Sequence, residues 1–429
     1  MARLDLRGQT MENAKQAMQR MLRNYGSLAL LVVLALPIGG AIGAVDALFG
    51  RGLLAIGAVR TAYFDWLIPF LPLAGLCIAA GYRRFGGTSS RGMGLVFAVG
   101  HGAEREIPIR LIPLVIGSTW LTHLFGGSAG REGVAVQIGA TISHWVGRRL
   151  AQPFDQDVFL VTGMAAGFAG LFQTPLAAAL FGMELLVAGE LRYQALLPAL
   201  AASWAASTVS HALGLEKFTV SVTALPLLDP LQICRLAGLG VLFGMAGLLF
   251  SVCLNRGKAA AARLLPNPLL RAGLLGSVLS VLIWSLGHGR YAGLGTNLIA
   301  ESFCDAKILP WDWILKLVLT VLTLAAGYQG GEVTPLFAIG ASLGALLAAP
   351  LHLPLALAAA LGYAAVFGSA TNTLLAPILI GCEVFGAQNL PAFVVVCAVA
   401  YAVNGNRSIY ALQKNRWHTV WFRSPASRA

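Results

Sequence analysis

A short glycine-rich motif that carries a glutamate occurs twice in the chain, about two hundred positions apart. The first copy spans residues 130–140 and reads GREGVAVQIGA, and the second spans residues 331–341 and reads GEVTPLFAIGA. Each copy places a carboxylate beside glycines where an apolar helix is expected to begin. In a chain this hydrophobic an acidic side chain is costly to keep near lipid, so both glutamates are candidates for function.

The duplication extends beyond this motif. Residues 165–185 align without gaps to residues 364–384, with nine identities in twenty-one places. Chance similarity between two helices of this composition would give only about two identities, so the chain is predicted to consist of two related halves. We place them at residues 26–213 and 230–405, joined by a linker at 214–229.

The composition predicts an all-α polytopic membrane protein. Of 429 residues, 57% are hydrophobic and only 11% are charged, against about a quarter charged in a soluble domain. Leu28–Val45, Leu236–Leu254 and Ala272–Leu286 have spanning or near-spanning length. Other apolar segments are short and interrupted by some of the 50 glycines and 19 prolines. We therefore expect tilted, broken and partly re-entrant helices, which are tolerated where they line a polar pathway.

The two ends of the chain predict its orientation and its lack of a regulatory domain. Residues 1–25 carry five basic side chains and no short apolar run with a cleavage site, so they are not read as a signal peptide. The positive-inside bias then places this segment in the cytoplasm, and Arg83 and Arg84 fit a return to that side. Residues 406–429 are expected to form a short helix or tail that carries Tyr410, with no regulatory domain. The net charge of +12 is assigned to loops rather than to a nucleic-acid surface.

Several function classes lack a signal in the sequence. The six cysteines and seven histidines are scattered without ligand spacing, so no metal site and no cofactor is expected. No Walker loop or dinucleotide fingerprint is present, which argues against a primary pump or a redox enzyme. A membrane enzyme of another kind would need a nucleophile or a cluster of bases, and none can be assigned.

The two motifs are suited to bind an anion. Residues 126–133 precede an apolar helix expected to start near Val134, and residues 330–335 precede another, with Pro335 in its first turn. Free backbone amides and the positive end of the helix dipole bind anions without a cation. Two such helix ends that meet at the repeat interface would form an anion pathway near the middle of the membrane.

The two motif glutamates allow several interpretations. Glu132 can occupy the anion site when it is ionised and leave it when it is protonated, which would couple protons to anions. Alternatively it is a static helix cap or an ion-pair partner of Arg131. Glu332 can be a cap, a second proton carrier or a residue that lines the anion path.

Two further features have both a functional and a plain interpretation. Residues 86–94 form a glycine-rich turn that opens the third apolar segment, and they offer either a third set of amides or an ordinary cytoplasmic turn. Tyr410 follows the last apolar run, where tyrosines often anchor a chain at the membrane interface. Its hydroxyl could instead donate to an anion.

In order and spacing, Gly130-Arg131-Glu132-Gly133, the turn from Gly331 to Pro335, and Tyr410 resemble the signatures of the CLC chloride channel and transporter family. The resemblance covers the chain from the first span to about residue 415. It implies a homodimer whose subunits each contain an anion pathway between two inverted repeats, with Glu132 as the gate. It also implies a multi-pass protein of the bacterial inner membrane.

At several positions the sequence differs from the pattern of the chloride-selective relatives. In these differences it resembles the fluoride-exporting branch of the family. Met93 stands in the turn where chloride-selective relatives carry a serine, and Val333 stands where they carry a phenylalanine. Val134 replaces the usual proline after the glutamate motif. Leu185 occupies the place of the cytoplasm-facing proton glutamate of chloride exchangers.

The resemblance thus implies fluoride/proton antiport, with a voltage-gated-type chloride channel or a chloride/proton exchanger as the alternative. Glu132 would gate the path and carry the proton, and Glu332 would help to set the coupling. The residues expected to bind the anion are Met93, Arg131, Gly133, Val333, Thr334 and Tyr410.

Overall fold

The fold is built from helices, and the two halves of the chain contain matching series of them. The computed structural model describes residues 2–150, 156–223, 229–304 and 308–415, with side chains from Gly26 onward. Helices of the first half are α1 (Ala2–Ala62), α2 (Phe64–Leu67), α3 (Leu71–Gly81), α4 (Met93–Gly100), α5 (Leu111–Leu124), α6 (Glu132–Gly147), α7 (Gln156–Phe172), α8 (Pro175–Leu185) and α9 (Leu196–Ala212). Helices of the second half are α10 (Pro230–Leu264), α11 (Pro268–Ser285), α12 (Thr296–Ser302), α13 (Asp312–Ala326), α14 (Val333–Ala348), α15 (Leu355–Thr371), α16 (Leu375–Phe385) and α17 (Leu390–Val403).

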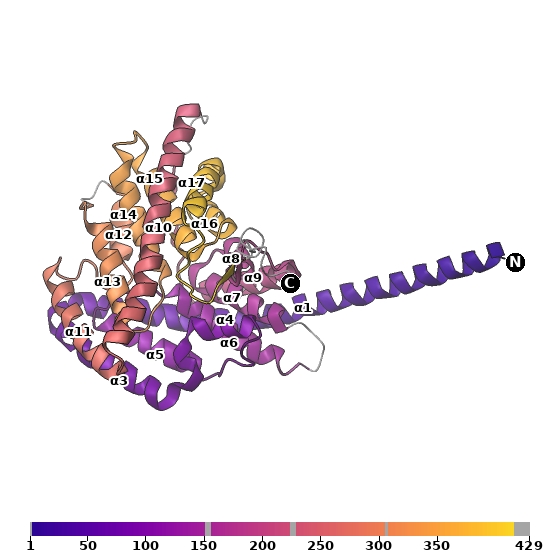
Figure 1. The fold of residues 1–429 in the computed structure, drawn as a ribbon, viewed down its shortest axis with the longest axis horizontal. Coiled ribbons are helices and arrows are strands. Elements are labelled where there is room, and N and C mark those ends of the chain that lie inside the picture. The colour runs from indigo at the N-terminus through magenta and orange to yellow at the C-terminus, as the bar shows by residue number, and fades with distance from the viewer. Residues whose placement is uncertain (1, 151–155, 224–228, 305–307, 416–429) are drawn as a thin grey trace, which may run out of the picture.

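Equivalent helices make equivalent contacts in the two halves. α6 packs on α7 as α14 packs on α15, and α1 packs on α9 as α10 packs on α17. The halves lie side by side and meet where α8 contacts α16 (Figure 1). Gly130 and Gly331, which occupy the same place in the two motifs, are hydrogen-bonded to each other as an antiparallel bridge. Equivalent residues that pair in this way are related by a local twofold axis, and the two repeats are inverted, as predicted.

Glycines allow the central helices of each half to approach closely. A Cβ on Gly139 would lie 2.1 Å from the carbonyl oxygen of Gly163, and a Cβ on Gly340 would lie 2.1 Å from that of Gly362. These residues lie on α6 and α7 and on α14 and α15. Small residues at the contacts of membrane helices let backbones pack against each other, which replaces the missing hydrophobic driving force in lipid.

Long spanning helices alternate with short broken ones, as the sequence predicts. Four helical segments of the described chain are long and apolar enough to cross a membrane: Gly26–Ala62, Phe64–Gly100, Pro230–Leu264 and Pro268–Ser285. Other apolar helices have only 10–17 residues. Such short helices leave their ends within the protein, where backbone amides can face a pathway.

The structure shows which conformation the two ends of the chain adopt. The N-terminal segment and the first span form one helix, α1, whose first part extends away from the remaining helices (Figure 1). Its sequence before Gly26 is rich in Ala, Met, Gln, Lys and Arg, which favour a helix and provide no stop signal. At the other end, residues 406–415 contain no helix. They form turns and the short strand β2 (Lys414–Asn415), which pairs in parallel with β1 (Val187–Ala188), while residues 416–429 lie outside the described part.

Two carboxylates, the buried Glu184 and the half-buried Glu383, join the halves because each caps a helix of the other repeat. Glu184, at the end of α8, accepts hydrogen bonds from the amides of Leu374 (2.9 Å) and Leu375 (2.7 Å) where α16 begins. Its counterpart Glu383, on α16, accepts from the amide of Ala177 (2.7 Å) in the first turn of α8. Amides of a first helical turn have no acceptor within their own helix, so each carboxylate satisfies donors of the other half.

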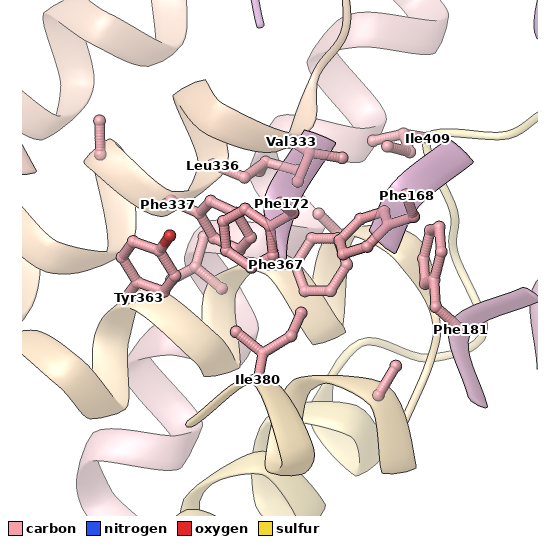
Figure 2. Packing of buried hydrophobic residues seen from close by; sticks show 14 of the residues in the cluster. Phe168, Phe172, Phe181, Val333, Leu336, Phe337, Tyr363, Phe367, Ile380 and Ile409 are labelled. Carbon is pink, nitrogen blue, oxygen red and sulfur yellow. The ribbon is translucent and has the colours of Figure 1, made fainter. Parts of the chain in front are cut away.

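A row of aromatic rings fills the space between the halves below Val333 (Figure 2). Phe337 stacks on Tyr363 with ring centroids 3.9 Å apart and on Phe172 at 5.1 Å. Phe168 and Phe367, which are equivalent in the two repeats, lie 6.4 Å apart. These rings form an apolar layer that leaves the motif loops as the polar part of the interior.

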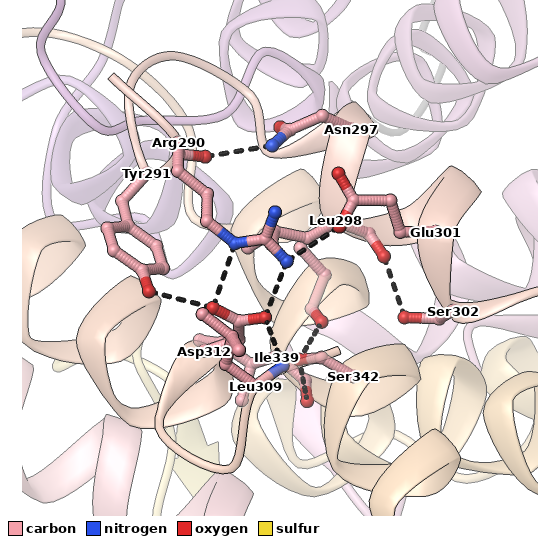
Figure 3. Close-up of polar contacts among 11 residues, drawn as sticks. Arg290, Tyr291, Asn297, Leu298, Glu301, Ser302, Leu309, Asp312, Ile339 and Ser342 are labelled. Atoms are coloured by element: carbon pink, nitrogen blue, oxygen red, sulfur yellow. Dashed lines mark hydrogen bonds and ion pairs between the residues drawn. The ribbon is translucent and has the colours of Figure 1, made fainter. Parts of the chain in front are cut away.

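A polar network ties the segment after α11 to the start of α13 (Figure 3). Asp312 accepts two hydrogen bonds from Arg290, at 3.0 and 2.7 Å, and one from the Tyr291 hydroxyl at 2.7 Å. Arg290 also donates to Glu301 at 2.6 Å. A bidentate arginine fixes direction as well as distance, so the turn between Tyr291 and α12 is held in one position.

Candidate anion-binding site

The N-termini of α6 and α14 meet at the interface of the two repeats, as the motif pair predicts. The Gly130 amide donates to the Gly331 carbonyl at 2.5 Å, and the Gly331 amide donates back at 2.7 Å. A Cβ on Gly130 would lie 2.8 Å from Pro335 Cδ. Glycine is therefore required at this point for the two loops to touch. The contact directs the open first turns of both helices toward one region.

Glu132 lies in front of the N-terminus of α14. The side chain is buried, and its Oε2 atom accepts from the Thr334 amide at 3.1 Å and from the Thr334 hydroxyl at 2.5 Å. Its Oε1 atom lies 3.6 Å from Arg131 Nε, which is a weaker ion pair. α6 begins at Glu132, two residues before the expected start at Val134. The carboxylate of one motif thus occupies the donor site of the other.

Glu332 is the residue before α14 and faces a different space from Glu132. Its Oε1 atom accepts from Lys258 Nζ at 3.3 Å, and the side chain of Glu332 is 12% exposed while that of Lys258 is 44% exposed. A Cβ on Gly133 would lie 3.5 Å from Glu332 Oε2. The Glu332 carboxylate therefore lies next to the first turn of α6, at an ordinary van der Waals distance.

A cavity of about 330 Å³ opens beside Glu332. Residues that line it include Ser90, Met93, Gln137, Lys258, Glu332 and Tyr410. The cavity brings together three of the predicted site residues, Met93, Glu332 and Tyr410, from three distant parts of the chain. We call it the Met93 cavity.

Donors face the Met93 cavity from several sides. Met93 is the first residue of α4, after Gly92 with φ 51°, so the amides of Met93 and Gly94 have no acceptor within the helix, while the Leu95 amide donates to the Gly92 carbonyl at 3.0 Å. The Tyr410 side chain is buried against Phe97, with ring centroids 5.2 Å apart, and its hydroxyl has no hydrogen-bond partner among the described residues. A buried hydroxyl without a partner is costly, and a bound anion or water would satisfy it.

Four predicted residues lie outside the lining of the Met93 cavity. Gly133, Val333 and Thr334 are buried at the two helix starts. The Arg131 side chain is directed toward Glu132, and its Nε and Nη1 atoms have no hydrogen-bond partner among the described residues. Arg131 therefore faces Glu132 and does not border the Met93 cavity.

The sequence analysis missed two polar residues of the site. Gln137 lies one turn after Gly133, donates to its carbonyl at 3.1 Å, and directs an unpaired Oε1 atom to the cavity side. Lys258 comes from α10 and pairs with Glu332. The available signal was a lysine shortly after the apolar run 236–254, since a charge on such a helix needs a partner.

The arrangement suits alternation between a carboxylate and an anion. Thr334 presents an amide and a hydroxyl at the positive end of α14, and these groups hold either a side-chain carboxylate or a free anion. The aromatic layer excludes water on one side, so this position has a low dielectric and its occupant interacts strongly with the donors. Loss of the Glu132 charge would free the Thr334 donors.

Comparisons with known proteins agree with this geometry. The sequence model of the voltage gated chloride channel family matches residues 74–405. A relative described as a chloride/fluoride channel protein, from Pseudomonas syringae pv. tomato, is 38% identical over 357 residues, which cover 81% of this chain and 78% of the relative. A relative described as an H(+)/Cl(-) exchange transporter, from Yersinia pseudotuberculosis, is 27% identical over 340 residues. The aligned region covers 73% of this chain and 70% of the relative. A crystal structure of a CLC-type fluoride/proton antiporter matches with a TM-score of 0.90 and 53% identity, over 91% of this chain and 99% of that chain.

Proposed function

Because the chain belongs to the voltage gated chloride channel (CLC) family and transports anions across a membrane, we propose that it exports fluoride in exchange for protons. The observation that carries this proposal is the contact of the Glu132 carboxylate with the amide and hydroxyl of Thr334. A group that both binds protons and occupies an anion site links the two fluxes.

In this mechanism Glu132 alternates between two states. When ionised, it accepts the two Thr334 hydrogen bonds and closes the path. When protonated, it loses most of its attraction for these donors and the helix end, so fluoride takes its place. Release of the proton on the other side lets Glu132 return and displaces the anion.

Selectivity for fluoride is supported by the kind of groups at the site. Fluoride is small and strongly hydrated, so it enters a dehydrated path only where donors replace its water. Amides near Met93 and Val333 and the hydroxyls of Thr334 and Tyr410 supply such donors. The fluoride/proton antiporter with 53% identity and the chloride/fluoride relative support the same assignment.

The remaining predicted residues have supporting roles in the proposal. Arg131 attracts the anion by its charge without lining the Met93 cavity, and Gly133 contributes the backbone of the first turn of α6 beside Glu332. Glu332 is paired with Lys258 at 3.3 Å. Its carboxylate changes the electrostatic potential along the path of a proton or an anion between the cavity and Glu132.

We also propose a homodimer in the plasma membrane of a bacterium, with the N-terminus in the cytoplasm. The proposal is supported by the family resemblance, by the bacterial relatives and by the basic residues that precede the first span.

Ion flux from liposomes tests the proposed function. Purified protein is reconstituted with fluoride or chloride inside, an outward gradient is imposed, and anion efflux is followed together with internal pH. We expect fluoride efflux with opposite proton movement and little chloride efflux. Brisk chloride efflux without fluoride preference would assign the chain to the chloride channel or exchanger alternative.

Tyr410→Phe is expected to weaken fluoride binding without destabilising the protein. The hydroxyl has no protein partner among the described residues, so its removal leaves no donor or acceptor unpaired. A hydrogen bond to a charged group contributes about 1.5–3 kcal/mol, which corresponds to at least about a tenfold rise in the fluoride KM of efflux. Tyr193→Phe, at an exposed position, is the matched control. An unchanged KM would remove Tyr410 from the anion path.

A further inference from the structure

The Met93 cavity has a counterpart in the other half of the molecule. The turn Gly92-Met93-Gly94 corresponds to Gly293-Leu294-Gly295, which lies 201 positions later, the spacing that also separates Gly130 from Gly331. Gly92 and Gly293 share a positive φ, 51° and 63°. Both turns lead into a helix, α4 in one half and α12 in the other. The same backbone conformation therefore occurs once in each repeat.

A second cavity, of about 560 Å³, lies at this second turn. Its lining includes Leu54, Gly57, Arg60, His123, Leu294 and Gly295. Five of these residues lie 201 positions from residues that line the Met93 cavity: Leu54 from Asn255, Gly57 from Lys258, His123 from Leu324, Leu294 from Met93, and Gly295 from Gly94. Since the repeats are inverted, the second cavity lies on the opposite face of the molecule. We call it the Arg60 cavity.

Arg60 supplies an uncompensated positive charge in this cavity. A Cβ on Gly293 would lie 1.9 Å from Arg60 Nη1, so the guanidinium rests where a side chain would otherwise stand. Arg60 forms no hydrogen bond or ion pair with another residue of the described chain. Arginine retains its charge and offers five donors, and these donors need acceptors.

A second basic side chain lies behind the same turn. Lys316 is fully buried, and its Nζ donates to the Gly293 carbonyl (2.7 Å), the Tyr291 carbonyl (3.1 Å) and the Ser128 hydroxyl (2.9 Å). All three acceptors are neutral. A buried ammonium without an anionic partner is costly, so a negative charge nearby would stabilise it.

Neighbouring groups do not cancel these charges. Asp312 lies one turn before Lys316 on α13, but its carboxylate is bound by Arg290 and the Tyr291 hydroxyl (Figure 3). His123 has its ring nitrogens 2.8 Å from the Thr119 carbonyl and 2.9 Å from the Ala129 carbonyl, so it contributes no negative group. The described residues around the Arg60 cavity therefore leave the Arg60 guanidinium without an anion, and they offer Lys316 only neutral acceptors.

We propose that the Arg60 cavity binds an anion, on the face of the protein opposite to the Met93 cavity. The ligand is a negatively charged group that accepts hydrogen bonds from the Arg60 guanidinium. This group belongs either to a free inorganic anion or to the phosphate of a lipid. The site adjoins the first motif through the backbone: the Gly293 amide donates to the Gly127 carbonyl and the Gly293 carbonyl accepts from the Ala129 amide, in the loop that leads to Glu132.

Bromide is the probe for a free anion at this site. The full-length protein is crystallised with bromide, and anomalous scattering locates the ions. We expect a peak within hydrogen-bonding distance of Arg60 that is absent from Arg60→Gln and present in Arg51→Gln. Arg51 is the matched control because it lies on the same helix, donates to the Leu213 carbonyl at 2.8 Å, and does not line the cavity. Calorimetric titration of the detergent-solubilised protein with bromide should show at least a tenfold loss of affinity at this site in Arg60→Gln.

The same crystals distinguish a lipid from a free ion. Phospholipid headgroup density at Arg60, lost in Arg60→Gln and in delipidated protein, would identify the lipid phosphate as the occupant. A cavity without bromide or lipid phosphate in the wild-type protein would overturn the proposal, and so would a bromide peak that persists in Arg60→Gln. The wild-type result decides the matter even if the variant fails to fold. Because no transport is measured, these outcomes are independent of fluoride/proton exchange.

Discussion

Glu132→Gln is expected to abolish proton-driven fluoride movement. The amide keeps the shape of the side chain and one oxygen that accepts from Thr334, but it neither carries a negative charge nor takes up a proton. Loss of a positioned proton-transfer group typically costs about 10²–10⁴ in rate. We therefore expect coupled proton and fluoride flux to fall at least about a hundredfold in the liposome assay.

Glu106→Gln is the control for this substitution. Its carboxylate is 65% exposed and pairs with Arg148 at the surface, so its loss should leave both fluxes unchanged. The melting temperatures of both variants should stay close to that of the wild type. Coupled flux that survives in Glu132→Gln would show that another group carries the proton, and the role assigned to Glu132 would be wrong.

Gly340→Ala is expected to prevent correct packing of the second repeat. The added Cβ would lie 2.1 Å from the Gly362 carbonyl oxygen and 2.5 Å from its carbon, both of which belong to the backbone of α15 and cannot rotate away. The helices would have to separate along their whole contact, and overpacking of this kind costs about 3 kcal/mol or more. The measurement is the yield of monodisperse protein and its melting temperature.

Gly238→Ala is the matched control in another helix of the same half. A Cβ on Gly238 meets no atom within 4 Å, and alanine favours the helix by about 1 kcal/mol over glycine. This variant should be as stable as the wild type or slightly more stable. A Gly340→Ala protein with normal yield and melting temperature would contradict the close approach of α14 and α15.

The repeat explains why much of the fold could be predicted. Duplicated motifs are expected at equivalent positions in the two halves. Glycines are expected where two backbones come into contact, and Gly130 and Gly331 do contact each other. The low charge and the short apolar segments predicted broken membrane helices, which the lengths of the helices confirm. The sequence left residues 406–429 open between a short helix and a tail, and in residues 406–415 the pairing of β2 with β1 decides the conformation, which no local signal reveals.

Site residues could be predicted only where a local sequence pattern marked them. Glu132 and Glu332 are marked by the glycines around them, and the structure places both at the meeting helix ends. The partners of these residues were not predictable, because each comes from a distant part of the chain. Lys258 is 74 positions from Glu332, and Thr334 is 202 positions from Glu132.

The sequence by itself therefore determined the class of protein, the duplicated plan and the two helix starts that can hold an anion. These follow from hydrophobicity, from glycine and from helix geometry, which act over a few residues. Only the tertiary structure decided that Glu132 occupies the donor site of the other repeat, and that Arg60 and Lys316 stand together without a carboxylate. Electrostatic partners depend on distances between groups, and the packing of distant helices sets those distances.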